Sequence, residues 1–93
     1  MKRFAVIGLG QFGTRIARGL SEQGAEVLAI DEQLQAIEAV RSQVSQAIEL
    51  NATDEQAFQA CGVDEVDVAV VAVSQLEVSI LVVAQLVRLA VPQ

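Results

Sequence analysis

Aromatic residues make up only 3% of this 93-residue sequence, although 53% of its residues are hydrophobic. The core must therefore be built from Val, Ala, Leu and Ile, a composition that suits a parallel sheet buried on both faces. There is one cysteine, Cys61. It cannot form a disulfide within the chain, and we expect it to be a small buried apolar residue.

Basic residues are also scarce, with six Lys and Arg against twelve Asp and Glu, and the formal net charge is −6. Binding to nucleic acid or to an anionic membrane surface requires clustered basic side chains, so the composition argues against both. The apolar stretch that starts at Phe4 is too short for a signal peptide, since glycines interrupt it, and we expect a cytoplasmic protein.

The chain also lacks an uninterrupted apolar run of the length that a membrane span needs. Residues 66–91 are the most apolar part, but a spanning helix requires about 20 mostly apolar residues. Polar residues interrupt this part at Ser74, Gln75, Glu77, Ser79, Gln85 and Arg88. We therefore expect a strand followed by a helix, and no direct membrane insertion.

Apolar patterning predicts four strands that alternate with four helices. The strands are expected over residues 4–7, 26–31, 47–50 and 67–73. The helices are expected over residues 11–23, over a segment carrying Leu34, Ile37, Val40 and Val44, over a short segment carrying Ala57, Phe58 and Cys61, and over residues 77–90 before Pro92. This order predicts an α/β domain over residues 1–93, with a Rossmann-like doubly wound parallel sheet and helices on both faces.

The apolar pattern also predicts which surfaces of two helices are buried or exposed. Phe12, Ile16 and Leu20 recur every four positions and should form the stripe of the first helix that packs on the sheet. The last helix is apolar around most of its circumference, so another subunit should cover it, or else it exposes an apolar patch. The alternation also indicates truncation before a fifth strand in a longer chain, which leaves the edge of the fourth strand open to pairing between chains.

A glycine motif, Gly8-Leu9-Gly10-Gln11-Phe12-Gly13, joins the first predicted strand to the first predicted helix. The Gly-x-Gly-x-x-Gly pattern alone is weak, but between a strand and a helix it is typical of a dinucleotide-binding turn. Gly8 should make the tight turn, Gly10 should let the pyrophosphate approach the backbone, and Gly13 should let the helix pack closely. The phosphates would then meet the free N–H groups at the start of the helix.

Asp31 follows the motif at the end of the second predicted strand, where its carboxylate could accept hydrogen bonds from both ribose hydroxyls. Its charge would repel a 2′-phosphate, and the next basic residue is Arg41. NADP is therefore disfavoured relative to NAD or an adenosine nucleotide. The alternative is an ordinary strand-to-helix turn with Asp31 as a helix-capping acid.

Polar residues also follow the third and fourth predicted strands, at the edge where ligands bind in open parallel sheets. Asn51 and Thr53 are equally consistent with contacts to an adenine and with a turn in which Thr53 or Asp54 caps the next helix. Ser74 and Gln75 follow the fourth strand at the same edge. Glu77 is expected to be a first-turn acid of the last helix rather than a ligand.

Histidine and tyrosine are absent, and the only lysine is Lys2. A dehydrogenase usually places one of these side chains beside the nicotinamide as a proton donor or acceptor. We therefore expect binding without turnover, and no enzyme activity within these residues. The cofactor domain of an NAD-dependent dehydrogenase without its catalytic domain is the alternative, and a purely structural α/β domain is a third hypothesis.

These motifs together resemble the RCK (TrkA-N, KtrA-like) family, over nearly the whole chain. The resemblance rests on Gly-Leu-Gly-Gln-Phe-Gly, the strand ending Val-Leu-Ala-Ile-Asp, the Asn-Ala-Thr-Asp turn and the strand Val-Ala-Val-Val-Ala-Val-Ser. It implies a regulatory domain that binds NAD(H), ATP, ADP, AMP or a related nucleotide. It also implies a homodimer or a higher ring that associates, at the inner face of the membrane, with a membrane-embedded potassium channel or transporter subunit.

The resemblance further implies a set of site residues. Phosphate contacts would come from Gly10, Gln11 and Phe12, the ribose contact from Asp31, and adenine-side contacts from Glu32, Asn51, Ala52 and Thr53. The rest of the pocket would be lined by Ala72, Val73 and Ser74.

Two positions depart from many ATP-responsive members of that family. Gln11 stands where they have Arg, and a neutral amide is a poorer partner for a terminal phosphate than a guanidinium. Leu76 stands where relatives often carry Asn or Asp. Both departures favour NAD(H) or a diphosphate nucleotide over ATP as the ligand. We expect regulation to work through a ligand that binds two arrangements of the dimer with unequal affinity.

Overall fold

A computed structural model describes residues 2–89. Strands and helices alternate along them, with one 3-10 turn, η1. The elements are β1 (Arg3–Ile7), α1 (Gln11–Glu22), β2 (Glu26–Asp31), α2 (Leu34–Val40), β3 (Gln46–Glu49), α3 (Glu55–Ala60), η1 (Val63–Glu65), β4 (Val68–Val71) and α4 (Leu76–Arg88). Among these residues, no helix has the length and apolar character needed to cross a membrane.

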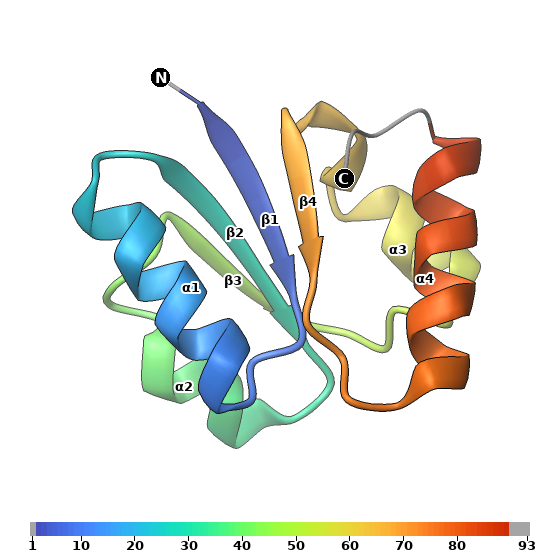
Figure 1. Cartoon of the computed structure of the whole chain (residues 1–93), viewed down its shortest axis with the longest axis horizontal. Coiled ribbons are helices and arrows are strands. Elements are labelled where there is room, and N and C mark those ends of the chain that lie inside the picture. The colour runs from blue at the N-terminus through green and yellow to red at the C-terminus, as the bar shows by residue number, and fades with distance from the viewer. Residues whose placement is uncertain (1, 90–93) are drawn as a thin grey trace.

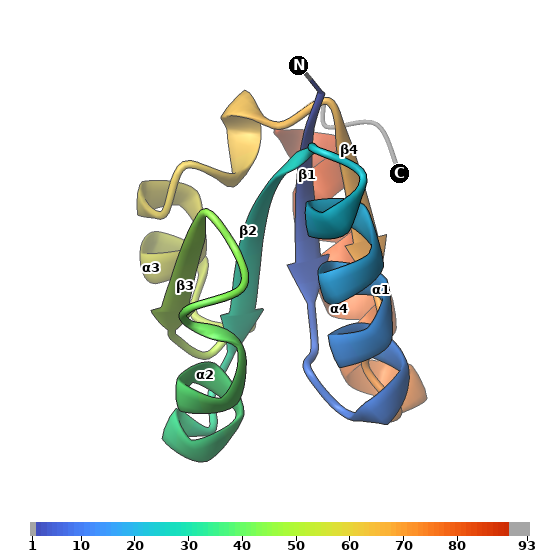
Figure 2. The same ribbon diagram turned by 90° about the vertical axis from the view of Figure 1, so that its left-hand side faces the viewer.

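The four strands form one parallel sheet in the order β3-β2-β1-β4 (Figures 1 and 2). Ile7 at the end of β1 pairs with Ile30 of β2 and with Val71 of β4, so the carboxyl ends of the strands lie at the same edge. The prediction of a Rossmann-like doubly wound sheet is confirmed.

Helices cover both faces of the sheet, with α1 and α2 on one face and α3 and α4 on the other (Figure 1). Side chains of β1 alternate between these faces because successive residues of a strand point to opposite sides. Val6 packs with Ala17 and Ile37 beneath α1 and α2. Ala5 and Ile7 pack with the α3 and α4 side, where Phe58 is fully buried. Each face thus has its own apolar core.

The stripe expected for α1 is wrong at Phe12, whose side chain is 70% exposed. The buried positions of α1 are Gly13 and Ala17, while Ile16 and Leu20 are half-buried. The first turn of α1 lies so close to the end of β1 that only small side chains fit on the face toward the sheet. Phe12, one residue before Gly13, therefore points away from the sheet.

Several element boundaries also differ from expectation. Helix α2 ends at Val40 rather than near Val44, because the chain turns there toward β3, and the Gln43 N–H donates to the Val40 carbonyl at 2.8 Å. Strand β3 spans Gln46–Glu49, one residue earlier than the predicted range of 47–50. Strand β4 spans only Val68–Val71, which is shorter than the predicted range of 67–73. The sequence pattern did not indicate η1. Ala90 and Pro92, the expected end and stop of the last helix, lie outside the described residues.

Helix α4 buries one face in the core and exposes apolar side chains elsewhere, as its composition predicted. Val82 and Leu86 are fully buried, whereas Leu76 is 74% exposed and Ile80 is 59% exposed. In this structure of a single chain, α4 therefore exposes apolar side chains, as predicted for a helix that no other subunit covers. Glu77 lies in the first turn of α4, also as expected.

Candidate functional site

The turn between β1 and α1 is shaped by Gly8 and Gly13. Gly8 has a φ of +99°, and a Cβ placed on it would lie 2.7 Å from the Ala72 carbonyl oxygen. A Cβ on Gly13 would lie 1.8 Å from the Gly8 carbonyl oxygen, which no real contact allows. The sharp turn and the close packing of α1 thus both depend on the absence of a side chain, as the motif predicted.

Gly10, the middle glycine of the motif, lies in open surroundings. A Cβ placed on it would meet no heavy atom within 4 Å, so nothing in the protein requires a glycine there. Gly10 is also the N-cap of α1, where no side chain caps the helix and no acid occupies the first turn. The start of α1 therefore keeps its positive dipole end free for an anion.

The Asp31 carboxylate connects β2 to the glycine turn. One of its oxygens accepts a hydrogen bond from the Leu9 N–H at 2.7 Å, and the other accepts one from the Gln33 N–H at 2.8 Å. Two carboxylate oxygens offer about four acceptor positions, so these bonds leave room for further donors such as hydroxyl groups. Asp31 both supports the turn and presents an anionic acceptor beside it.

The turn between β3 and α3 is held by its own polar side chains. The Asn51 Oδ1 accepts hydrogen bonds from the Thr53 N–H at 2.9 Å and from the Thr53 hydroxyl at 2.6 Å. Asp54, rather than Thr53, caps α3, because its carboxylate accepts a bond from the Ala57 N–H at 3.3 Å. The structure therefore places Asn51 and Thr53 in a turn, and it leaves both of them exposed.

A cavity of about 340 Å³ lies at the carboxyl edge of the sheet, between the end of β2 and the β3–α3 turn. Its lining includes seven of the residues expected to form the site, which are Gly8, Asp31, Glu32, Asn51, Ala52, Thr53 and Val73. Other lining residues are Ile7, Ile30, Gln33, Leu50, Gln75 and Val78. Of these, Gln75 was expected at this edge, while Gln33 and Val78 were not. Gln33 could have been found as a close neighbour of Asp31, but Val78 belongs to a helix distant in sequence.

The other six expected residues do not line this cavity. They are Gly10, Gln11, Phe12, Gly13, Ala72 and Ser74. Gln11 and Phe12 are exposed at the start of α1, beside the cavity rather than inside it. Ala72 packs by its backbone against Gly8, and its N–H donates to the Ile7 carbonyl at 2.8 Å. The structure thus separates the expected site into residues that line the cavity and residues that do not.

The charges around the cavity are acidic. Asp31 and Glu32 are among its lining residues, which include no Lys or Arg. Phosphate groups inside this cavity would therefore meet no cationic side chain and would be repelled by two carboxylates. The start of α1 is the part of this edge whose charge and N–H groups suit an anion.

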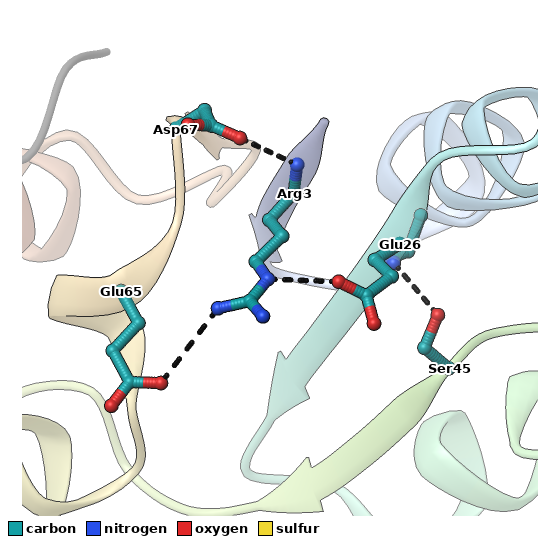
Figure 3. Close-up of polar contacts among 6 residues, drawn as sticks. Arg3, Glu26, Ser45, Glu65 and Asp67 are labelled. Carbon is teal, nitrogen blue, oxygen red and sulfur yellow. Dashed lines mark hydrogen bonds and ion pairs between the residues drawn. The ribbon is translucent and has the colours of Figure 1, made fainter. Parts of the chain in front are cut away.

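A second cavity, of about 270 Å³, lies at the opposite edge of the sheet. There the Arg3 Nε pairs with the Glu26 carboxylate at 2.8 Å, and the Arg3 N–H donates to the Asp67 carboxylate at 2.8 Å (Figure 3). These contacts join the starts of β1 and β2 to the segment before β4. We interpret this edge as structural, since its charged groups satisfy one another.

Cys61 lines that second cavity and is half-buried, less buried than expected. Its thiol donates a hydrogen bond to the Phe58 carbonyl with an S···O distance of 3.0 Å. Burial raises the pKa of the Cys61 thiol, which keeps it protonated at neutral pH and poorly reactive. Cys61 therefore takes no part in the candidate site.

The strand order, the glycine turn and the acid at the end of β2 place the chain in the class of Rossmann-like α/β domains. Residues 4–92 match the TrkA-N domain family. The chain belongs to this family, and the resemblance noted in the sequence is confirmed.

Among its relatives are the Ktr system potassium uptake proteins A of Vibrio alginolyticus, 44% identical over 52 residues, and of Bacillus subtilis (strain 168), 45% identical over 53 residues. The matched segments cover 56% and 57% of this chain, but only 24% of either relative. The chain therefore corresponds to a minor part of each of these longer proteins.

Solved structures of other proteins share the fold. The NAD(P)-binding domain of an exopolyphosphatase-related protein from Archaeoglobus fulgidus has a TM-score of 0.82 at 24% identity, covering 96% of this chain and 67% of that domain. The AMP-bound C-terminal domain of Kef from Shewanella denitrificans has a TM-score of 0.74 at 20% identity, covering 94% and 52%. Saccharopine dehydrogenase from Saccharomyces cerevisiae has a TM-score of 0.83 at 20% identity, covering 98% and 20%. At such identities the likeness shows the fold alone.

Proposed function

We propose that this chain is the nucleotide-binding regulatory domain of a potassium uptake system and that it binds NAD(H) or an adenine nucleotide. The observation that carries the proposal is the cavity at the carboxyl edge, bordered by the Asp31 carboxylate and adjoining the uncapped start of α1. Family membership supports it, since the relatives named above are potassium uptake proteins.

In the proposed binding mode, the adenosine half of the ligand occupies the cavity. The ribose hydroxyls donate to the Asp31 carboxylate, and the base lies against Asn51, Ala52 and Thr53, with Glu32 and Val73 nearby. The phosphates extend out of the cavity to the backbone at Gly10, Gln11 and Phe12. This arrangement keeps the phosphates away from the acidic lining and next to the positive end of α1. Ala72, whose backbone lies against Gly8, supports the turn from the end of β4.

The domain is proposed to act by binding, without turnover. Nucleotide binding would favour one of two arrangements of a homodimer or ring, and this bias would reach a membrane-embedded partner on the cytoplasmic side. The exposed apolar residues of α4 are consistent with a protein partner there. The dehydrogenase alternative has less support, because histidine and tyrosine are absent from the sequence.

Calorimetric titration with NADH, NAD, ADP, AMP, ATP and NADP tests this proposal directly. We expect NAD(H), ADP or AMP to bind more tightly than ATP, and we expect NADP to bind most weakly, since Asp31 and Glu32 would repel its 2′-phosphate. If a chain shown to be folded by circular dichroism binds none of the six ligands, the proposed function is wrong.

The Gln11→Arg variant tests the preference against ATP. Gln11 is exposed at the start of α1, so a longer side chain fits without disturbing the core. A guanidinium can pair with a terminal phosphate through two hydrogen bonds, and the affinity ratio of ATP to NADH should rise by roughly tenfold. The Gln23→Arg variant makes the same exchange at the opposite end of α1, at an exposed residue outside the cavity lining, and should leave this ratio unchanged. An unchanged ratio in Gln11→Arg would remove the argument against ATP.

A further inference from the structure

Helix α4 contains a buried amide that the proposed function does not use. Gln85 is 3% exposed and lies between Val82 and Leu86, which are fully buried on the same helix. Its Nε2 donates a hydrogen bond of 2.6 Å to the carbonyl of Ala52, in the β3–α3 turn. A carbonyl can only accept, so this contact also determines which way the amide points.

This bond fixes the orientation of the peptide unit between Ala52 and Thr53. In a trans peptide the C=O and the following N–H point in opposite directions. The carbonyl of this unit points to Gln85 in the core, and its N–H donates to the Asn51 Oδ1 at 2.9 Å. The peptide is thus held from both sides, by α4 and by a side chain that borders the cavity.

Stability alone is a weak reason for an amide at this position. The Gln85 Oε1 is buried and has no hydrogen-bond partner among the described residues. The net stabilisation from one neutral hydrogen bond does not exceed the cost of leaving a buried acceptor unpaired. The bond to Ala52 therefore gives little net stabilisation. Its definite effect is geometric, because it determines where the β3–α3 turn lies.

A second contact joins the same two segments. The Arg88 guanidinium, one turn beyond Gln85, lies 3.4 Å from the Glu55 carboxylate at the start of α3. Both groups are exposed, so this ion pair adds little stability. It nevertheless shows that the last turn of α4 lies near the start of α3. Gln85 makes the buried contact between them.

We propose that Gln85 is a positioning residue for the adenosine half of the ligand, acting through the Ala52–Thr53 peptide. This inference rests on the proposed nucleotide-binding function. Gln85 itself touches no ligand. It holds Asn51 and Thr53 where they border the cavity, so its loss should weaken contacts to the base and leave the contacts to ribose and phosphate unchanged.

The Gln85→Met variant tests this inference by removing the donor while keeping a similar volume. NMR titration of the ¹⁵N-labelled 93-residue chain would compare AMP with ribose 5-phosphate, which lacks the base. The affinity for AMP should fall about tenfold, equivalent to about 1.4 kcal/mol, and the affinity for ribose 5-phosphate should stay within about twofold. The Val82→Ala variant is the control, because it disturbs the same buried face of α4 and leaves the Gln85–Ala52 hydrogen bond in place. It should weaken neither ligand selectively.

Equal loss of affinity for both ligands in Gln85→Met would indicate a merely structural role and overturn the inference, as would no loss at all. If Gln85→Met does not fold, the side-chain NH₂ signal of Gln85 in the unmodified chain decides instead. It should shift when AMP binds and not when ribose 5-phosphate binds, and any other result overturns the inference. Failure of the unmodified chain to bind either ligand would instead overturn the proposed function.

Discussion

Replacing Gly13 with Ala is expected to destabilise the domain by about 3 kcal/mol, the upper part of the range for overpacked sites. The new Cβ would lie 1.8 Å from the Gly8 carbonyl oxygen and 3.3 Å from the Ala72 Cβ. The Gly8 oxygen belongs to a backbone that is itself held in the turn, so α1 must move away from β1. Urea unfolding followed by circular dichroism would measure the loss, and nucleotide binding should weaken as the start of α1 shifts.

The matched control is Gly19→Ala, the same substitution in the same helix. A Cβ on Gly19 would meet nothing within 4 Å, and the residue is exposed. Alanine favours a helix over glycine by about 1 kcal/mol, so this variant should gain stability by roughly that amount. If the two variants changed the free energy of unfolding alike, close packing at Gly13 would not be what requires a glycine.

Replacing Asp31 with Ala is expected to lower the affinity for NADH or AMP by roughly tenfold to 150-fold, equivalent to about 1.5–3 kcal/mol for charged hydrogen bonds. In the proposed binding mode the variant loses the acceptor for the ribose hydroxyls. It also leaves the Leu9 N–H without its 2.7 Å partner, so the glycine turn should become less stable. Calorimetric titration would measure the affinity, and thermal unfolding the change in stability.

Asp67→Ala separates these two effects. The Asp67 carboxylate also accepts a backbone hydrogen bond, from the Arg3 N–H at 2.8 Å, but at the opposite edge of the sheet (Figure 3). This variant has the same change of charge and loses a similar bond, so it should lose stability while its affinity stays within about twofold. Unchanged affinity in Asp31→Ala would show that the ribose assignment is wrong.

Much of the fold could be predicted from local patterns. Strand β2 was predicted over its observed residues, because Val27 to Ile30 form a continuous apolar run that ends at Asp31. The end of α1 was predicted to within one residue, and Gly24, which follows it, has a positive φ. The predictions failed where the chain turns without such a residue. Helix α2 ends at Val40 although apolar spacing continues to Val44.

The candidate site could be predicted where it consists of residues that directly follow strands. In a parallel sheet these residues gather at one edge whatever the details of packing, which is why Asp31, Asn51 and Thr53 lie around one cavity. Val78 and Gln85 could not be predicted in the same way. Their roles depend on where α4 lies relative to the β3–α3 turn, and no spacing along the chain encodes that.

The sequence by itself determined the order of the elements, the parallel sheet and the requirement for glycine at positions 8 and 13, because periodicity and conformational freedom are local properties. Only the tertiary structure decided that Phe12 is exposed while Ala17 is buried, that Asp31 holds the Leu9 N–H, and that Gln85 holds the Ala52 carbonyl. The Asp31–Leu9 hydrogen bond joins residues 22 positions apart in the chain, and the Gln85–Ala52 bond joins residues 33 positions apart. The exposure of Phe12 follows from the close approach of α1 to β1. Such contacts are set by how the helices pack on the sheet.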